Sequence, residues 1–119
     1  PKDGKDMVKI LDLSRSLEHP CAIRYPRGNE SNFENYDTPV VYGKSELLLH
    51  GTQGAIIAEG KMVRTAYKAC ELLSQKGISM TLLNLRFIKP LDQDALLELA
   101  KKHSSIFTIE DGVKAGGMG

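Results

Sequence analysis

Apolar side chains at helical spacing open the chain and predict a short helix over residues 6–18. Pro20 ends this helix, and alternating apolar positions predict a brief strand over residues 21–25. One helix and one strand cannot enclose a core. We therefore expect residues 1–28 to be the tail of a preceding domain, poorly ordered or docked on a second copy of the chain. The apolar face behind this expectation comprises Met7, Ile10, Leu11, Leu17 and Ile23.

The next stretch, from Gly28 to Pro39, is rich in Asn, Gly, Ser and acidic residues. Such a composition buries little apolar surface and is typical of a linker. We assign residues 29–39 to an interdomain linker and residues 40–119 to a second domain.

The second domain begins with two apolar runs at residues 45–50 and 55–58. They flank Gly51-Thr52-Gln53-Gly54, which predicts an antiparallel hairpin with a four-residue loop. Residues 62–75 then show helical spacing, and Gly77 is placed to end that helix.

The rest of the domain alternates strands and helices. Residues 78–88 predict a strand, Asp92 is placed to cap a helix that continues to Lys102, and residues 105–109 predict the next strand. This alternation is typical of parallel β-α-β crossovers in a layered α/β fold. The residues expected to face inward from the helix after Asp92 are Ala95, Leu96, Leu99 and Ala100.

Composition narrows the class of protein. A hydrophobic fraction of 41% and a charged fraction of 26% are those of a folded globular chain. A net charge of +1 argues against a general nucleic-acid binder. No apolar run approaches the roughly 20 residues that cross a bilayer, and no signal peptide opens the chain.

Cys21 and Cys70 are too few and too far apart for a disulfide framework or zinc site, so we expect buried thiols in a cytosolic protein. Lacking an initiating Met, the chain is interpreted as a piece of a longer one.

Arg24 and Arg27 are the first candidates for chemistry, because they flank Tyr25-Pro26 just before Gly28. Guanidinium groups can hold a phosphate or carboxylate through paired hydrogen bonds. In an extended segment the two side chains need not share a face. Composition alone favours the alternative, an interdomain salt bridge beside a solvated arginine.

The glycines of residues 116–119 could cradle an anion on backbone N–H groups, but a tight strand-to-helix turn fits the pattern better. Glu110 and Asp111 follow a predicted strand, where α/β sheets place ligands. A solvated edge or a cap for the next helix explains them equally well, and we assign them no catalysis. We expect surface positions for the histidines, which are His19, His50 and His103.

Several motifs together carry a resemblance to a known family. They are Pro-Cys-Ala-Ile-Arg-Tyr-Pro-Arg-Gly-Asn at residues 20–29, Gly-Lys-Met-Val at 60–63, Asn-Leu-Arg-Phe-Ile-Lys-Pro-Leu-Asp at 84–92, and Thr-Ile-Glu-Asp-Gly at 108–112 followed by Gly-Gly-Met-Gly. In this order and spacing the chain resembles the 1-deoxy-D-xylulose-5-phosphate synthases, thiamine-diphosphate enzymes of the transketolase superfamily.

The resemblance implies a domain organisation. Residues 1–28 would end the pyrimidine-binding domain, and residues 40–119 would form most of a transketolase C-terminal-like domain. That domain is expected to be a three-layer α/β unit with a mostly parallel five-stranded sheet, truncated here at its C-terminus.

The resemblance also implies an activity for the intact enzyme, a transferase that condenses pyruvate, with decarboxylation, and glyceraldehyde 3-phosphate to 1-deoxy-D-xylulose 5-phosphate. This product supplies isoprenoid, thiamine and pyridoxal synthesis. Arg27 matches the position that contacts the substrate phosphate, and Arg24 is a possible secondary contact. The intact enzyme is expected to use thiamine diphosphate and Mg²⁺ and to form a homodimer, in the bacterial cytoplasm or in a plastid. Cofactor, metal and catalytic residues lie outside these 119 residues, so the chain alone is expected to be inactive.

Two alternatives remain open. The β subunits of 2-oxoacid dehydrogenase E1 components share the third domain and an Arg-x-x-x-Pro-Leu-Asp stretch, but they usually lack Arg-Tyr-Pro-Arg-Gly. A stand-alone α/β binding module is the other alternative.

Overall fold

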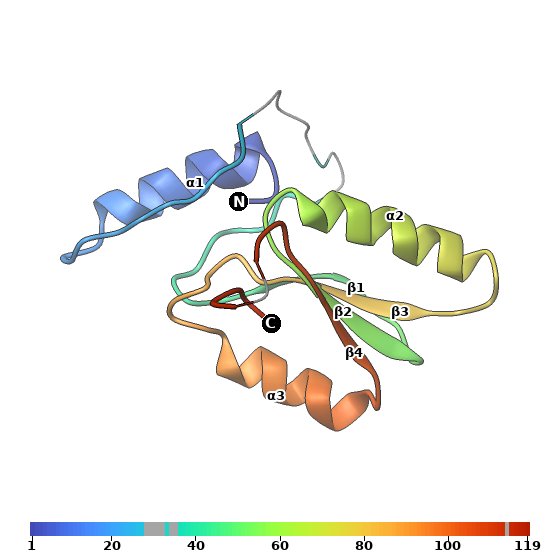
Figure 1. Ribbon diagram of the computed structural model, residues 1–119. Helices are drawn as coiled ribbons and strands as arrows, with labels where there is room; N and C mark the ends of the chain where they lie inside the picture. The colour runs from blue at the N-terminus through green and yellow to red at the C-terminus, as the bar shows by residue number, and fades with distance from the viewer. Residues whose placement is uncertain (28–32, 34–35, 114) are drawn as a thin grey trace.

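A mixed four-stranded sheet lies between helices α2 and α3 in the computed structural model (Figure 1). The structure describes residues 1–27, 33, 36–113 and 115–119. A separate helix, α1, precedes the sheet. In chain order the elements are α1 (Gly4–Arg15), β1 (Glu46–Leu49), β2 (Gly54–Ala58), α2 (Met62–Ser74), β3 (Met80–Asn84), α3 (Gln93–Lys102) and β4 (Ile106–Ile109).

The strand order across the sheet is β1-β3-β2-β4. Strand β2 pairs in parallel with both β3 and β4, and β1 runs antiparallel to β3. The α/β class and the parallel crossovers are therefore as the sequence predicts. The five-stranded, mostly parallel sheet is not confirmed: the described residues form a mixed sheet of four strands, in which two pairings are parallel and one is antiparallel.

The predicted hairpin of residues 45–50 and 55–58 is wrong, because β3 lies between β1 and β2. The connecting loop crosses the start of β3, where Thr52 and Gln53 donate backbone hydrogen bonds to the carbonyl of Ser79 at 3.2 and 3.0 Å. A Cβ atom at Gly51 would lie 2.2 Å from the carbonyl carbon of Met80. A glycine is thus required at this position, because the loop passes close over β3 before β2 begins on the other side of that strand.

Each face of the sheet is covered by one helix, which gives the expected three layers. Side chains of α2 pack on the face that carries Ile56 and Leu82, and Leu99 of α3 packs on the face that carries Ile57 and Leu83. Successive residues of a strand point to opposite faces, so β2 and β3 supply both layers and are buried throughout. The predicted inward position of Ala100 is wrong, since this residue is exposed.

Strand β3 is shorter than the predicted strand of residues 78–88. It ends at Asn84, and two residues later Arg86 adopts a φ of 55°, in the left-handed region. A residue there cannot continue a strand, so the chain turns away from the sheet.

Helix α3 starts as predicted at the N-cap Asp92, whose side chain accepts a hydrogen bond from the backbone N–H of Ala95. The same carboxylate accepts the N–H of Ser45 at 2.7 Å and pairs with Lys44 at 3.1 Å. Burial raises the pKa of Asp92, but these three contacts outweigh it and lower the pKa below its ordinary 3.8.

We expect Asp92→Ala to lower the free energy of unfolding by about 1–2 kcal/mol, because the cap is lost. The depressed pKa gives a second expectation. The contribution of Asp92 is complete above its unfolded pKa and is lost as the pH falls through the lower folded pKa. Urea unfolding at a series of pH values measures both. Asp92→Asn keeps a capping oxygen but cannot titrate, so its stability should fall less than that of the parent chain in acid; equal losses would contradict this.

The secondary structure of the first 27 residues differs from the prediction. Helix α1 begins and ends earlier than predicted, with Asp3 as N-cap and Ser16 as C-cap. Lys2, Asp6 and Ile10 are buried within this same chain, whereas Leu11 of the predicted apolar face is exposed. Docking of the segment on a second copy stays a prediction. Residues 21–25 are extended but form no strand.

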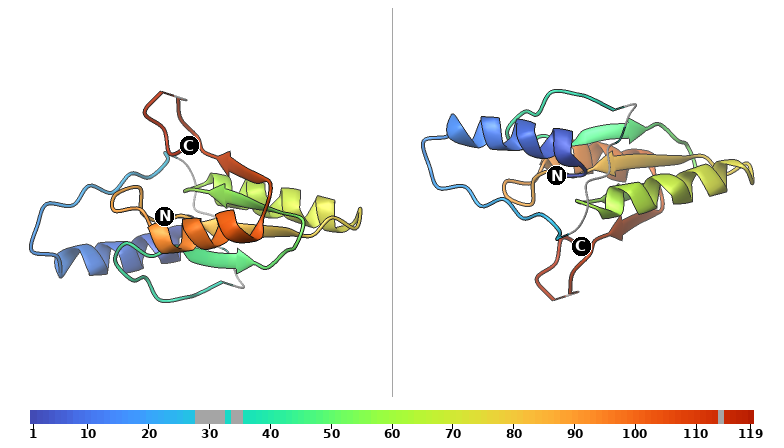
Figure 2. Two further views of the ribbon diagram at one scale, coloured as in Figure 1. Left: turned by 90° about the horizontal axis from the view of Figure 1, so that it is seen from below. Right: turned by 90° about the horizontal axis from the view of Figure 1, so that it is seen from above.

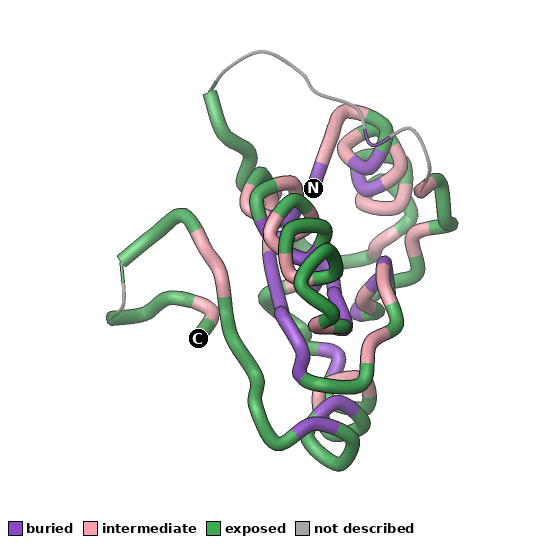
Figure 3. The backbone as a smooth tube through the Cα atoms, turned by 90° about the vertical axis from the view of Figure 1, so that its right-hand side faces the viewer, coloured by how far each residue is buried: buried purple, intermediate pink, exposed green. Residues whose placement is uncertain are grey.

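The chain after α1 turns back and leaves the helix (Figure 2). Residues 19–26 of this segment line the same cavity as Asp111, which follows β4. Figure 3 shows the contrast in burial, with the sheet interior buried and β4 and the residues after it mostly exposed.

The linker prediction needs correction at Phe33. This side chain is only 8% exposed and packs in the α2 side of the core, with its ring edge-on to Tyr67 at 5.4 Å between centroids. Tyr36 joins the same aromatic group. The expectation that residues 28–39 bury little is therefore wrong at this position; residues 28–32 and 34–35 lie outside the described part.

Candidate functional site

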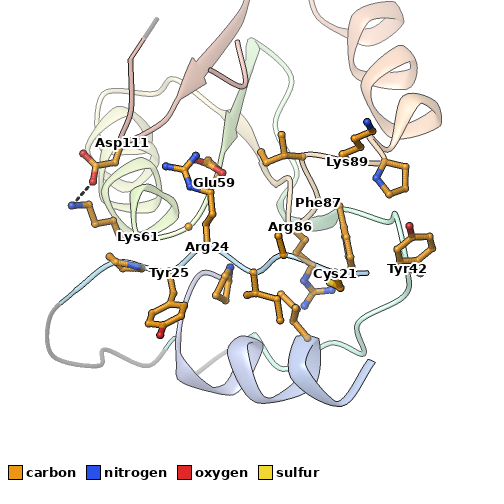
Figure 4. A pocket seen from close by; sticks show the side chains of 18 of the residues that line it. Cys21, Arg24, Tyr25, Tyr42, Glu59, Lys61, Arg86, Phe87, Lys89 and Asp111 are labelled. Atoms are coloured by element: carbon orange, nitrogen blue, oxygen red, sulfur yellow. Dashed lines mark ion pairs between the residues drawn. The ribbon is translucent and has the colours of Figure 1, made fainter. Parts of the chain in front are cut away.

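A cavity of about 770 Å³ opens at the carboxyl ends of the parallel strands (Figure 4). Residues 59–61 after β2 and residues 86–90 after β3 form one wall, and Asp111 after β4 joins them. Helix α2 leaves β2 toward one face of the sheet, and α3 leaves β3 toward the other. A crevice arises where neighbouring strands connect in opposite directions, and α/β proteins bind ligands at such points.

The opposite wall comes from residues 19–26, the extended segment that follows α1. Ile10 of α1 also lines the cavity. The site is therefore assembled from both parts of the chain, the N-terminal helix with its following segment and the sheet domain.

The structure separates the two candidate arginines. Arg24 lines the cavity, and its guanidinium group points toward the side where Glu59 lies (Figure 4). Arg27 is exposed and lies outside the cavity lining. Neither has an ion pair or hydrogen bond with another described residue, so the interdomain salt bridge favoured by composition is not formed within the described part.

Glu110 and Asp111 have separate roles. The Glu110 carboxylate accepts the backbone N–H groups of Met118 at 2.7 Å and Gly119 at 3.3 Å. This glycine loop therefore donates to the chain's own carboxylate. The described residues contain no helix after β4, so the strand-to-helix turn and the cap for a following helix stay predictions. Asp111 forms an ion pair with Lys61 at 2.5 Å across the rim of the cavity.

A buried cluster of charges behind the cavity is the feature that the sequence did not reveal. Lys2, Asp6, Glu46 and Arg86 have side chains that are at most 2% exposed. The Arg86 Nη2 atom lies 3.0 Å from carboxylate oxygens of both Asp6 and Glu46, and Lys2 Nζ lies 2.8 Å from Glu46. The guanidinium also donates to the carbonyl oxygen of Pro39 at 2.9 Å. We name these four charged residues the charge cluster.

The carboxylate of Glu46 is well satisfied within the charge cluster. Thr38 Oγ1 and Asn84 Nδ2 donate to it at 2.6 and 2.9 Å. Burial raises the pKa of Glu46, but bonds from Lys2, Thr38 and Asn84 and the nearby Arg86 charge outweigh it, so the pKa is lowered. Glu46 is therefore held ionised.

One signal in the sequence could have indicated the cluster. Glu46 occupies an inward position of an otherwise apolar strand, and a carboxylate there requires a buried cationic partner. The pattern does not identify that partner.

The remaining polar candidates need two corrections. His103 was expected at the surface but is 8% exposed, and its Nε2 lies 3.0 Å from Thr81 Oγ1. Cys21 was expected to be buried but is exposed, whereas Cys70 is buried as expected. His19 and His50 are exposed as predicted.

Within the described residues no three His, Cys, Asp or Glu side chains gather in a way that could hold a metal ion. We derive no step through the Mg²⁺ and diphosphate groups that the resemblance implies for the intact enzyme. None of the helices in the described part is long and apolar enough to cross a membrane.

Comparison with known proteins identifies the family of the sheet domain. Residues 43–119 match the family model described as transketolase, C-terminal domain. The chain belongs to the transketolase C-terminal domain family. Helix α1 and the segment after it precede the matched region, and the curated relatives extend the likeness to them.

Those relatives are 1-deoxy-D-xylulose-5-phosphate synthases. The synthase of Caldanaerobacter subterraneus subsp. tengcongensis is 43% identical over 120 residues, and that of Natranaerobius thermophilus is 38% identical over 121 residues. Both alignments cover 100% of this chain but 19% of the relative. The chain thus spans about a fifth of the length of these synthases.

A solved structure supports the whole arrangement. It is described as a split gene transketolase, inactive beta4 tetramer, and it is 26% identical with a TM-score of 0.93. The likeness covers 99% of this chain and 39% of that one. It therefore includes the docked α1 and the segment that forms the second wall of the cavity.

Proposed function

We propose that this chain is part of a 1-deoxy-D-xylulose-5-phosphate synthase, a thiamine-diphosphate-dependent transferase. The enzyme would decarboxylate pyruvate and join the remaining two-carbon unit to glyceraldehyde 3-phosphate, giving 1-deoxy-D-xylulose 5-phosphate and CO₂. The observation that carries this proposal is the 36–43% identity to synthases over the whole chain, including the Arg-Tyr-Pro-Arg-Gly motif outside the family model.

Within that enzyme we assign residues 1–28 to the end of a pyrimidine-binding domain and residues 29–39 to the linker. Residues 20–27 support this assignment, because no backbone hydrogen bond joins them to any other described element. An extended, exposed segment whose backbone does not pair with another described element is suited to pair with further chain. We also propose that the full-length enzyme is a cytoplasmic homodimer that uses Mg²⁺.

The geometry also bears on the acceptor substrate. We propose that Arg27 binds the phosphate of glyceraldehyde 3-phosphate. The Arg27 guanidinium has no partner among the described residues and is exposed. Arg27 directly follows residues 19–26, which line the cavity at the carboxyl ends of the strands. Arg24, which faces the cavity, is assigned a supporting role in the wall.

A domain exchange tests the proposal. The present sequence should replace the equivalent fifth of the Caldanaerobacter synthase with synthase activity within about tenfold of the parent, because 43% identity preserves the interfaces. The 119-residue chain alone should show no turnover and no thiamine-diphosphate binding by calorimetry. A soluble, dimeric but inactive chimera would contradict the proposal. Stoichiometric cofactor binding by the chain alone at micromolar affinity would overturn the domain assignment.

A further inference from the structure

The charge cluster joins three segments that are far apart in the sequence. Lys2 precedes the N-cap of α1 and Asp6 lies in its first turn, Glu46 begins β1, and Arg86 follows β3. The two cations and two anions balance, and all four side chains are almost completely buried. Charges buried in this way persist only with close partners, so the three segments are held in one geometry.

Arg86 is the centre of the cluster. Its Nε and Nη2 contact Asp6, Nη2 also contacts Glu46, and Nη1 donates to the carbonyl of Pro39. The guanidinium thereby bonds to α1, to β1 and to the end of the linker at once. Only the planar fork of arginine offers donors in these three directions, so a lysine could satisfy one or two of them.

We propose that Arg86 is a positioning residue, which sets the location of α1 and, through α1, of the segment that ends at Arg27. This inference rests on the proposed function, because the proposed function assigns phosphate binding to Arg27. Arg86 would not touch the substrate. Its effect would be to keep the phosphate-binding guanidinium at the correct distance from the reacting centre.

The segment itself offers few other restraints. Within the described part, residues 20–27 form no backbone hydrogen bond to another element, and all but Ile23 are exposed. A tilted ring contact between His19 and Tyr42, with centroids 5.6 Å apart, is the described aromatic link at its start. The position of the segment therefore depends on α1, and α1 is docked on the rest of the chain through Lys2, Asp6 and Ile10.

The test uses the full-length enzyme and two variants of the cluster. Arg86→Lys keeps the charge but removes the fork. The double variant Arg86→Met/Asp6→Asn removes one charge of each sign and keeps the Lys2–Glu46 pair, so the cluster stays neutral even where Arg86→Met alone fails to fold. Lys44→Met is the matched control, since its ion pairs with Asp92 and Asp94 are remote from α1.

The kinetic readout is the acceptor ratio, defined as kcat/KM for glyceraldehyde 3-phosphate divided by kcat/KM for glyceraldehyde. A displacement of about 1 Å at a substrate contact can cost about 100-fold. We therefore expect both cluster variants to lower the acceptor ratio by about 10- to 100-fold, mainly through KM, and Lys44→Met to leave it unchanged. A merely structural role would lower activity with both acceptors alike.

Hydrogen exchange supplies an independent readout. Amides of residues 4–15 should exchange faster in the two cluster variants and at the parent rate in Lys44→Met. The positioning role alone would be overturned if the cluster variants fold and keep the acceptor ratio of the parent, while the ratio of Arg27→Ala falls. An unchanged ratio in Arg27→Ala would instead reject the phosphate assignment of the proposed function, and the positioning role with it.

Discussion

Arg86→Met is expected to lower the free energy of unfolding of this chain by about 3–5 kcal/mol, the range found when one partner of a buried ion pair is removed. The substitution leaves Asp6 and Glu46 facing a single cation, Lys2, in a site where the side chains are at most 2% exposed. It also leaves the carbonyl oxygen of Pro39 without its donor. Methionine fills a similar volume, so the loss reports charge and hydrogen bonding more than packing.

Two further variants make this expectation specific. Adding Asp6→Asn to Arg86→Met should recover a large part of the lost stability, because the remaining Lys2 and Glu46 charges balance at 2.8 Å. Lys44→Met removes a half-exposed lysine from its ion pairs and should lower stability far less than Arg86→Met, because exposed ion pairs contribute little. Denaturant unfolding at neutral pH measures all three. A single variant no less stable than Lys44→Met would show that the cluster contributes little.

The charge cluster could not be predicted because Arg86 pairs with Glu46 and Asp6, which lie 40 and 80 positions earlier in the sequence. In the sequence, Lys2 and Asp6 have the spacing of an ordinary pair on an exposed helix face, and Arg86 falls inside an apparent strand. Each residue has a plausible local explanation. Only the fold brings the opposite charges together and removes the water between them.

Helices α2 and α3 were predictable for the opposite reason. Their apolar spacing and the Asp92 cap are local properties, and the structure reproduces them within about one residue. Strand order is not local. The pattern around Gly51 is equally typical of a hairpin and of a loop that crosses β3, and the close approach of Met80 that decides between them is absent from the sequence.

The candidate site was predictable only in part. The Arg-Tyr-Pro-Arg-Gly motif indicates which side chains could bind an anion, but alternation in an extended segment does not determine which of them faces the cavity. The structure places Arg24 there and leaves Arg27 exposed. The cavity itself could not be predicted, because it needs the strand order that places the ends of β2 and β3 side by side.

Arg27→Ala in the full-length enzyme is expected to lower kcat/KM for glyceraldehyde 3-phosphate by about 10- to 150-fold. The estimate follows from the loss of a charge-assisted hydrogen-bonding partner, which costs about 1.5–3 kcal/mol. Because the phosphate is remote from the bond that forms, much of the loss should appear in KM, with a smaller effect on kcat. Steady-state kinetics with both acceptors measures it, and a non-phosphorylated aldehyde should be used almost as well as by the parent enzyme.

Arg24→Ala is the matched control, since it removes the same side chain from the same segment. Arg24 lines the cavity on the side of Glu59, so its loss should affect the two acceptors alike and leave thiamine-diphosphate affinity unchanged in both variants. A larger phosphate-specific loss from Arg24→Ala would move the anion contact from the exposed end of the segment into the cavity. Equal losses with both acceptors from Arg27→Ala would mean that this guanidinium stabilises the segment and does not bind the phosphate.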